Sequence, residues 1–210
     1  MASSQSEEAG FRQVLEELRR AGLLLLTDPR LPSVAGLVAG EPIRGSWWGH
    51  PRGRAIFLAA RKLAAHPDVL AAKLISGKVT YVHRRLWPAL LGVATSGEPW
   101  QKRGLSRPAR ALLREVARKG LVAECAGEGP RELENRLLVH SEEVHTETGA
   151  HAKRLESWEH WAGRVGFTER KLAAGEAKKE LEQALRTLGA RAGAGGRLPW
   201  QSRTRASSSL

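Results

Sequence analysis

Apolar residues recur at helical spacing through most of this chain and alternate with polar residues in only a few short runs. Seven segments have helical spacing: 7–22, 29–38, 52–65, 88–94, 106–119, 130–138 and 167–189. Several have end signals, such as the N-cap Ser106 and the stop glycines Gly22 and Gly120. The pattern therefore predicts an α+β protein that is mainly helical.

The clearest strand signal is a β-hairpin near the centre of the chain. Val69 to Ile75 and Val79 to His83 are β-prone runs separated by a turn containing Gly77,. A two-residue loop at this turn gives one face with the composition Val69, Ala71, Lys73, Ile75, Thr80 and Val82,. Lys73 is then the one cation on an otherwise apolar face.

This position gives Lys73 two alternative roles. A lysine among apolar neighbours loses hydration, its pKa falls, and the neutral amine can act as a nucleophile that forms a Schiff base. Alternatively, its aliphatic stem lies along the apolar face while the ammonium reaches water or a phosphate.

The C-terminal half has a different order of elements. A helix from Ser106 to Lys119, a short strand at residues 121–123, a helix from Pro130 and two extended runs around Thr148-Gly149 follow one another. This stretch resembles a truncated winged-helix DNA-binding domain. It is also similar to the winged-helix units of the AlkZ-like DNA glycosylases, whose wing strands likewise follow a leucine-rich helix. The resemblance covers 106–161 and includes no catalytic motif, so it implies DNA binding and assigns no site residue.

These patterns predict four parts. They are a basic helical domain with the hairpin (1–104), a winged-helix-like unit (105–166), a C-terminal helix (167–190) and a flexible basic tail (191–210). The tail contains Arg197, Arg203 and Arg205, which could order around nucleic acid, and Trp200, which could fold back onto the body,.

The number of cysteines and the lengths of the apolar runs indicate the cellular compartment in which the protein is expected. A single cysteine, Cys125, fits a reducing environment,. The first residues lack a secretory pattern, and the longest apolar run, residues 21–26, is too short to span a bilayer,. We therefore expect a cytoplasmic protein with no membrane partner.

The net charge of +12 points to a polyanionic partner,. Residues 41–120 hold sixteen basic and four acidic side chains, which accounts for the whole excess. Because the charge is concentrated rather than spread along the chain, we expect a nucleic-acid partner, namely double-stranded DNA.

A loop with two adjacent tryptophans, Trp47 and Trp48, lies within this basic block and precedes Arg52 and Arg54. Indole rings in a basic, glycine-hinged loop can stack on bases or enter a duplex. They can equally anchor the loop on the core. His50, in the same loop, is a candidate acid, base or phosphate donor.

Further cations are candidate phosphate ligands. Arg84 and Arg85 follow His83 close to a helix start, where amide groups and guanidinium groups together favour an anion. Lys78 lies beside the hairpin turn, and Lys102 and Arg103 lie in a predicted basic loop. A solvated cluster without a ligand is the alternative.

The histidines at 140, 145, 151 and 160 and Cys125 do not follow a recognised zinc spacing,. The sequence therefore predicts neither a metal site nor a cofactor.

Three functions remain open. The first is a DNA-binding protein that grips the backbone through its central basic surface, in repair or regulation. The second is a DNA-repair enzyme of the abasic-site lyase or glycosylase type, in which Lys73 attacks the sugar carbon with help from His50 or His83. The third is an adaptor that binds a protein through its C-terminal helix.

Overall fold

The computed structural model describes residues 2–145, 151–190 and 192–201. It confirms the α+β class and the mainly helical character. Its first sheet contains β1 (Leu23–Leu25), β2 (Val69–Lys73) and β3 (Val79–His83), in the order β1-β3-β2. Its second sheet contains β4 (Leu121–Cys125), β5 (His140–His145) and β6 (His151–Glu156), in the order β4-β6-β5. All strand pairs are antiparallel.

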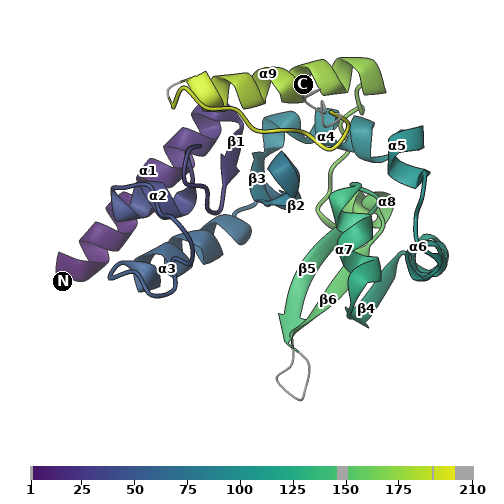
Figure 1. Ribbon diagram of the computed structural model, residues 1–210, viewed down its shortest axis with the longest axis horizontal. Coiled ribbons are helices and arrows are strands. Elements are labelled where there is room, and N and C mark those ends of the chain that lie inside the picture. Colours follow the sequence, from purple (N-terminus) through teal and green to yellow (C-terminus); the bar gives the residue numbers. More distant parts are fainter. Residues whose placement is uncertain (1, 146–150, 191, 202–210) are drawn as a thin grey trace, which may run out of the picture.

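Helices surround these two sheets (Figure 1). On the first-sheet side lie α1 (Ala2–Ala21), α2 (Val34–Ala39) and α3 (Gly53–Ala64). The second sheet is flanked by α6 (Arg107–Lys119), α7 (Glu128–Asn135) and α8 (Trp158–Arg164). The short helices α4 (Trp87–Ala94) and α5 (Pro99–Lys102) join the two sides, and α9 (Ala174–Ala190) lies across the top of α4.

The hydrophobic core consists of a large cluster and a small one. The large cluster joins α1, the first sheet, α4 and α9, and it also receives Leu137, Trp158 and Trp161 from the second half of the chain. The small cluster lies between α6, α7 and the second sheet and contains Leu105, Ala109, Val116, Leu133, Val139 and Leu155. Residues from both halves of the chain therefore share the large cluster.

The hairpin is present, but the predicted register is wrong. Lys73 pairs with Val79, and Val69 pairs with His83. A 3₁₀ turn at Ile75–Gly77, with Ser76 at a φ of 52°, lengthens the predicted two-residue loop. The pairing therefore shifts by one residue, and each residue of β3 lies on the face opposite to the predicted one. Lys73 shares its face with Val79, Tyr81 and His83 instead of Thr80 and Val82.

Other elements also differ from the prediction. Residues 23–25 form a third strand beside β3, so the hairpin is part of a sheet. The predicted basic loop around Lys102 begins with α5, because Glu98 and Gln101 form a capping box,. The helix predicted from Phe167 begins at Ala174, and α8 was not predicted.

The C-terminal segment is packed where the structure describes it. Leu198 is buried, and the Ser76 amide donates to the Arg197 carbonyl at 2.7 Å. Trp200 Nε1 donates to Glu182 Oε1 at 2.8 Å, which confirms that this indole folds back onto the body. The expected flexible tail is therefore wrong for residues 192–201, while Arg203 and Arg205 lie outside the described residues.

Candidate nucleic-acid interface

A cleft of about 890 Å³ separates the first sheet from the second. One wall is formed by the end of α3, the segment after it and β2; the other is formed by β5, β6 and α8. Figure 1 shows α3 and the second sheet as two arms on either side of this space. The cleft could hold a flexible ligand segment or part of a polymer, and the exposed groups at its edge decide which.

The most exposed large apolar side chain described is Trp48, at 67%. Its ring stacks on the buried ring of Trp47, with centroids 4.1 Å apart and planes 23° from parallel. The loop is held tightly, since the His50 amide donates to the Trp47 carbonyl at 3.1 Å and the Gly53 amide donates to the His50 carbonyl at 2.7 Å. A Cβ on Gly53 would meet the Trp48 carbonyl oxygen at 3.0 Å, so glycine allows α3 to begin directly beneath the indoles. Trp47 is thus an anchor, and Trp48 is a fixed ring facing solvent.

The exposed face of α3 connects this ring to the cleft. Trp48 lies 5.7 Å from Phe57, centroid to centroid, and the Arg61 guanidinium lies 5.6 Å from the Phe57 ring centroid. Arg61 also lines the cleft. Phe57 and Arg61 are one helical turn apart, so an aromatic and cationic strip runs along α3 from the loop to the cleft. Sequence reasoning did not assign either residue to the site, because the contact of Phe57 with Trp48 depends on the fold of the loop and Arg61 joins the strip through Phe57.

Cations surround this strip. Arg52 and Arg54 are exposed at the start of α3, as predicted. Neither these two nor Arg61 forms an ion pair with a carboxylate in the described part of the chain. Their guanidinium groups are therefore available to an anionic partner.

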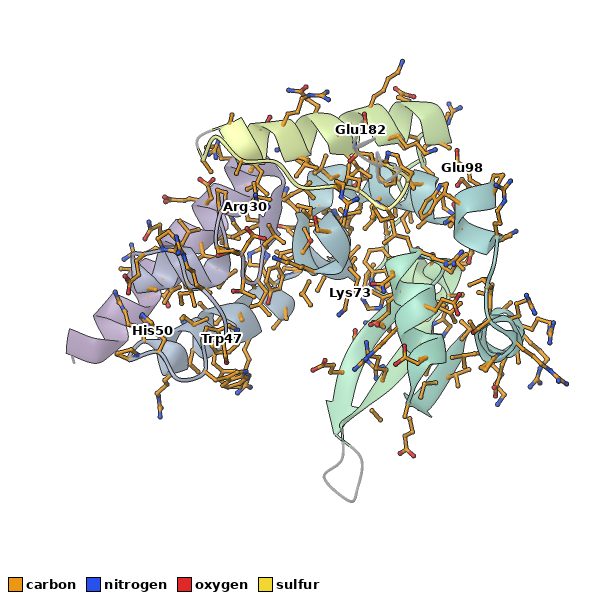
Figure 2. All side chains as sticks on the ribbon, in the orientation of Figure 1. Arg30, Trp47, His50, Lys73, Glu98 and Glu182 are labelled. Atoms are coloured by element: carbon orange, nitrogen blue, oxygen red, sulfur yellow. The ribbon has the colours of Figure 1, made fainter. Side chains whose placement is uncertain are left out.

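Lys73 lines the cleft from the end of β2. It is half-buried and shares its face with Val79. Figure 2 places Lys73 near the centre of the molecule, between the first sheet and the second. This position agrees with a lysine whose stem packs on the sheet while its ammonium is presented to a ligand in the cleft.

The two histidines predicted to assist Lys73 lie elsewhere. His50 Nε2 lies 3.2 Å from Glu41 Oε1, and its Nδ1 accepts a hydrogen bond from the Arg52 amide. His50 is not among the residues that line the cleft, and Figure 2 shows it on the α3 side of the molecule. His83 is on the Lys73 face but four residues along β3 from its partner Val79, about 13 Å away,. Instead, His66 and Glu143 line the cleft with Lys73.

His83 has a structural role at the end of β3. Its Nδ1 accepts a hydrogen bond from the Arg85 amide at 3.4 Å. Partial burial lowers the pKa of His83, and Arg85 and Arg19 act in the same direction against the opposing effect of Asp68. This histidine is a neutral cap rather than a proton carrier in the cleft.

Three predicted phosphate ligands have internal partners. Lys78 Nζ lies 2.6 Å from Asp28 Oδ2, and Arg84 pairs with Glu169 and lies over the Trp87 ring. Arg85 Nη2 donates to the Arg20 carbonyl at 3.1 Å. These contacts tie distant segments together, and none of the three cations lines the cleft.

Lys102 and Arg103 are exposed at the end of α5, just before α6. They do not line the cleft. The sequence-predicted cations therefore divide into a group at α3, a structural group around β3 and a group leading into α6.

The wall formed by the second sheet carries paired charges. Glu134 contacts Lys153 Nζ and Ser141 Oγ, and Glu142 contacts Arg154 and Arg164. Cations balance Glu134 and Glu142 on this wall. Glu143 also lines the cleft, is exposed and has no ion pair with a described residue, so it opposes a polyanion locally,. Sequence spacing did not identify Glu134 or Lys153, which are brought together by β6 packing beside α7.

Among the residues described, no group of three or more histidine, cysteine, aspartate or glutamate side chains is placed to hold a metal ion. No helix within the described ranges is both long and apolar enough to cross a membrane. Comparisons with protein-family models, curated proteins and solved structures gave no match for this chain.

Proposed function

We propose that this protein binds double-stranded DNA across the cleft, with Trp48 contacting bases and the arginines of α3 contacting the phosphate backbone. The observation that carries the proposal is the exposed indole of Trp48, fixed in place by the buried indole of Trp47. A ring that is already held in place offers a flat apolar face on which a base can stack, and stacking would remove that face from water.

The adjoining charges favour a polyanion over an apolar partner. Arg52, Arg54 and Arg61 flank the ring and lack described acidic partners, so they can bind phosphates at little desolvation cost,. Lys73 extends the same cationic surface into the cleft.

The second half of the chain supports a nucleic-acid role through its topology. The order α6, β4, α7, β5, β6 together with the sheet order β4-β6-β5 agrees with the winged-helix resemblance,. The structure offers less support for the lyase alternative, since neither His50 nor His83 lies with Lys73 in the cleft.

The test is duplex binding by fluorescence anisotropy with Trp48→Ala. Loss of one stacking ring should weaken binding of a 20-base-pair duplex about tenfold, since stacking on one base contributes about 1–3 kcal/mol. Trp48→Phe should retain most of the affinity. Arg54→Gln combined with Arg61→Gln should reduce the salt dependence by about two counterions.

Arg186→Gln is the matched charge control, because Arg186 is exposed on α9 and bonds only Gln183 among the described residues. It should bind as the wild type does. Salt-independent binding, or equal affinity of wild type and Trp48→Ala, would refute the proposal.

A further inference from the structure

An arginine stripe runs along α6, on the arm opposite α3. It is formed by Arg107, Arg110, Arg114 and Arg118, all of them exposed. At 100° per residue the four positions fall within an arc of about 80° and extend over about 16 Å of the helix axis. We call these four residues the α6 stripe.

None of the four arginines forms an ion pair with a carboxylate of the described chain, although Arg110 and Arg118 are near enough to help lower the pKa values of Glu132 and Glu115. The carboxylate of α6, Glu115, is engaged by Lys119 Nζ at 2.6 Å. Arg110 Nη1 donates to the Leu105 carbonyl at 2.5 Å, which leaves its other guanidinium nitrogens available. Four adjacent guanidinium groups repel one another, so an arrangement of this kind is stabilised by a polyanion.

The remaining face of α6 is already used. Ala109 and Val116 are buried in the small core cluster, and Leu112 and Leu113 pack against it. Helices that lie on membrane surfaces insert an exposed apolar face into the lipid, and α6 has none to offer. A partner must therefore be recognised through charge and guanidinium hydrogen bonds alone.

The neighbouring helix α7 has the opposite character. Its acids are engaged internally: Glu128 with Arg131, Glu132 with Arg136 and the Ser106 amide, and Glu134 with Lys153. In a winged-helix unit the helix before the hairpin enters the groove, but a phosphate polymer is repelled by carboxylates. The charge distribution places the contact on the first helix of the unit instead.

We infer that the α6 stripe is a second docking surface for the phosphate backbone of DNA, separate from the cleft. This inference rests on the proposed function for the identity of the ligand but uses different residues on a different arm. The 16 Å stripe matches the axial rise of about five nucleotides of one strand. Lys102 and Arg103 precede the stripe and extend its charge.

The experiment compares duplex binding by the wild type, by a variant carrying Arg107→Gln, Arg110→Gln, Arg114→Gln and Arg118→Gln, and by a control. The control carries Lys179→Gln and Arg186→Gln on α9, where both side chains are exposed. With a 40-base-pair duplex, the α6 variant should bind at least tenfold more weakly than wild type, and its plot of log affinity against log salt should be shallower by about 3. The control should match the wild type. Thermal unfolding should show that the variant is still folded, because all four side chains are exposed and the relief of their repulsion offsets the loss of the Arg110 hydrogen bond,.

The outcomes separate the two proposals. If Trp48→Ala and the α6 variant each lower the affinity for DNA, both surfaces are supported. If only the α6 variant lowers the affinity, the stripe is supported and the cleft proposal is refuted. Wild-type affinity in the α6 variant overturns the inference. It is also overturned if the wild type binds phosphatidylserine vesicles but no DNA, and the α6 variant loses that vesicle binding.

Discussion

Glu156 is the residue on which the junction between the two parts of the molecule depends. It lies at the end of β6 and is 1% exposed. Arg164 binds it through two nitrogens, at 2.9 and 2.8 Å, and His160 Nδ1 lies 2.7 Å from Oε1. His140 Nδ1 lies 3.3 Å from Oε2 but is not aligned for a hydrogen bond. These contacts fasten α8 to the second sheet while Trp161 of α8 packs on Trp87 of the main core.

Glu156→Gln should destabilise the protein in a pH-dependent way. Burial alone would raise the pKa of this carboxyl, but Arg164, His140 and His160 outweigh burial and hold the pKa well below its ordinary value of 4.5. A carboxylate whose pKa is lower in the folded state stabilises the protein fully at pH values above its unfolded-state pKa. This stabilisation is lost as the pH falls toward and through the folded-state pKa. The variant should therefore have a free energy of unfolding about 2–3 kcal/mol below wild type at pH 7.

Urea unfolding measures the difference in the free energy of unfolding between Glu156→Gln and wild type. This difference should become smaller as the pH drops below about 4.5. Glu159→Gln is the control, because Glu159 is an exposed neighbour on α8 with only a 3.8 Å pair to Lys171. It should change stability by less than about 0.5 kcal/mol. A deficit that is constant from pH 7 to pH 3.5 would contradict the assigned role of the charge.

At this scale, local sequence identifies the type of a residue better than its partners. Trp48 and Arg54 were predicted because their chemistry is visible in the loop and the helix start. The partners of Lys78 and Arg84, Asp28 and Glu169, lie 50 and 85 positions away in the chain, so only the fold could show that these cations are engaged.

The packing of α9 on α4 closes the top of the molecule (Figure 1). Leu172, just before α9, donates its amide to the Pro88 carbonyl at 3.1 Å. Gly92 on α4 makes this approach possible, because a Cβ there would lie 2.3 Å from the Leu172 carbonyl oxygen and 3.2 Å from Ala177 Cβ. The position of α9 therefore depends on the absence of one side chain.

Gly92→Ala should lower the free energy of unfolding by about 2 kcal/mol, because the added methyl group forces α9 and the segment before it away from α4. Gly175→Ala is the same chemical change in the first turn of α9, where nothing lies within 4 Å of the new Cβ. It should leave stability unchanged or raise it by up to about 1 kcal/mol, owing to helix propensity. Urea unfolding of the two variants measures the contrast, and equal stability of both would contradict the close packing of α4 and α9.

At the scale of elements, periodicity predicted the type of most helices and strands but not the register of the hairpin. The pattern in residues 69–83 fits either a two-residue loop or a longer one, and a 3₁₀ turn at Ile75–Gly77 decided the outcome. Ile75 is held there by burial and by the hydrogen bond that its backbone N–H donates to Thr80 Oγ1 at 3.1 Å, and both are tertiary features. The segment Leu23–Leu25 was not predicted to be a strand because three leucines have no period.

The whole molecule combines a large core with a small one, and their stabilities should differ. Buried apolar side chains of the small core come from α6, α7 and the second sheet, whereas the large core joins elements from both ends of the chain. Fewer buried apolar groups give a lower free energy of local opening. In the free protein, amides of β5 and β6 should therefore exchange with deuterium faster than those of β2 and β3.

Duplex DNA bound across the cleft should raise the protection of both arms. A ligand that contacts both α3 and the second sheet stabilises only the state in which both arms are folded, so opening of the second arm must release it. With duplex at about 100 times its dissociation constant, protection of the β5 and β6 amides should increase by about 2.7 kcal/mol, together with protection in α3. Hydrogen exchange followed by mass spectrometry measures both arms in one sample. Protection gained in α3 alone would mean that the ligand contacts only the tryptophan arm and that the cleft is not bridged.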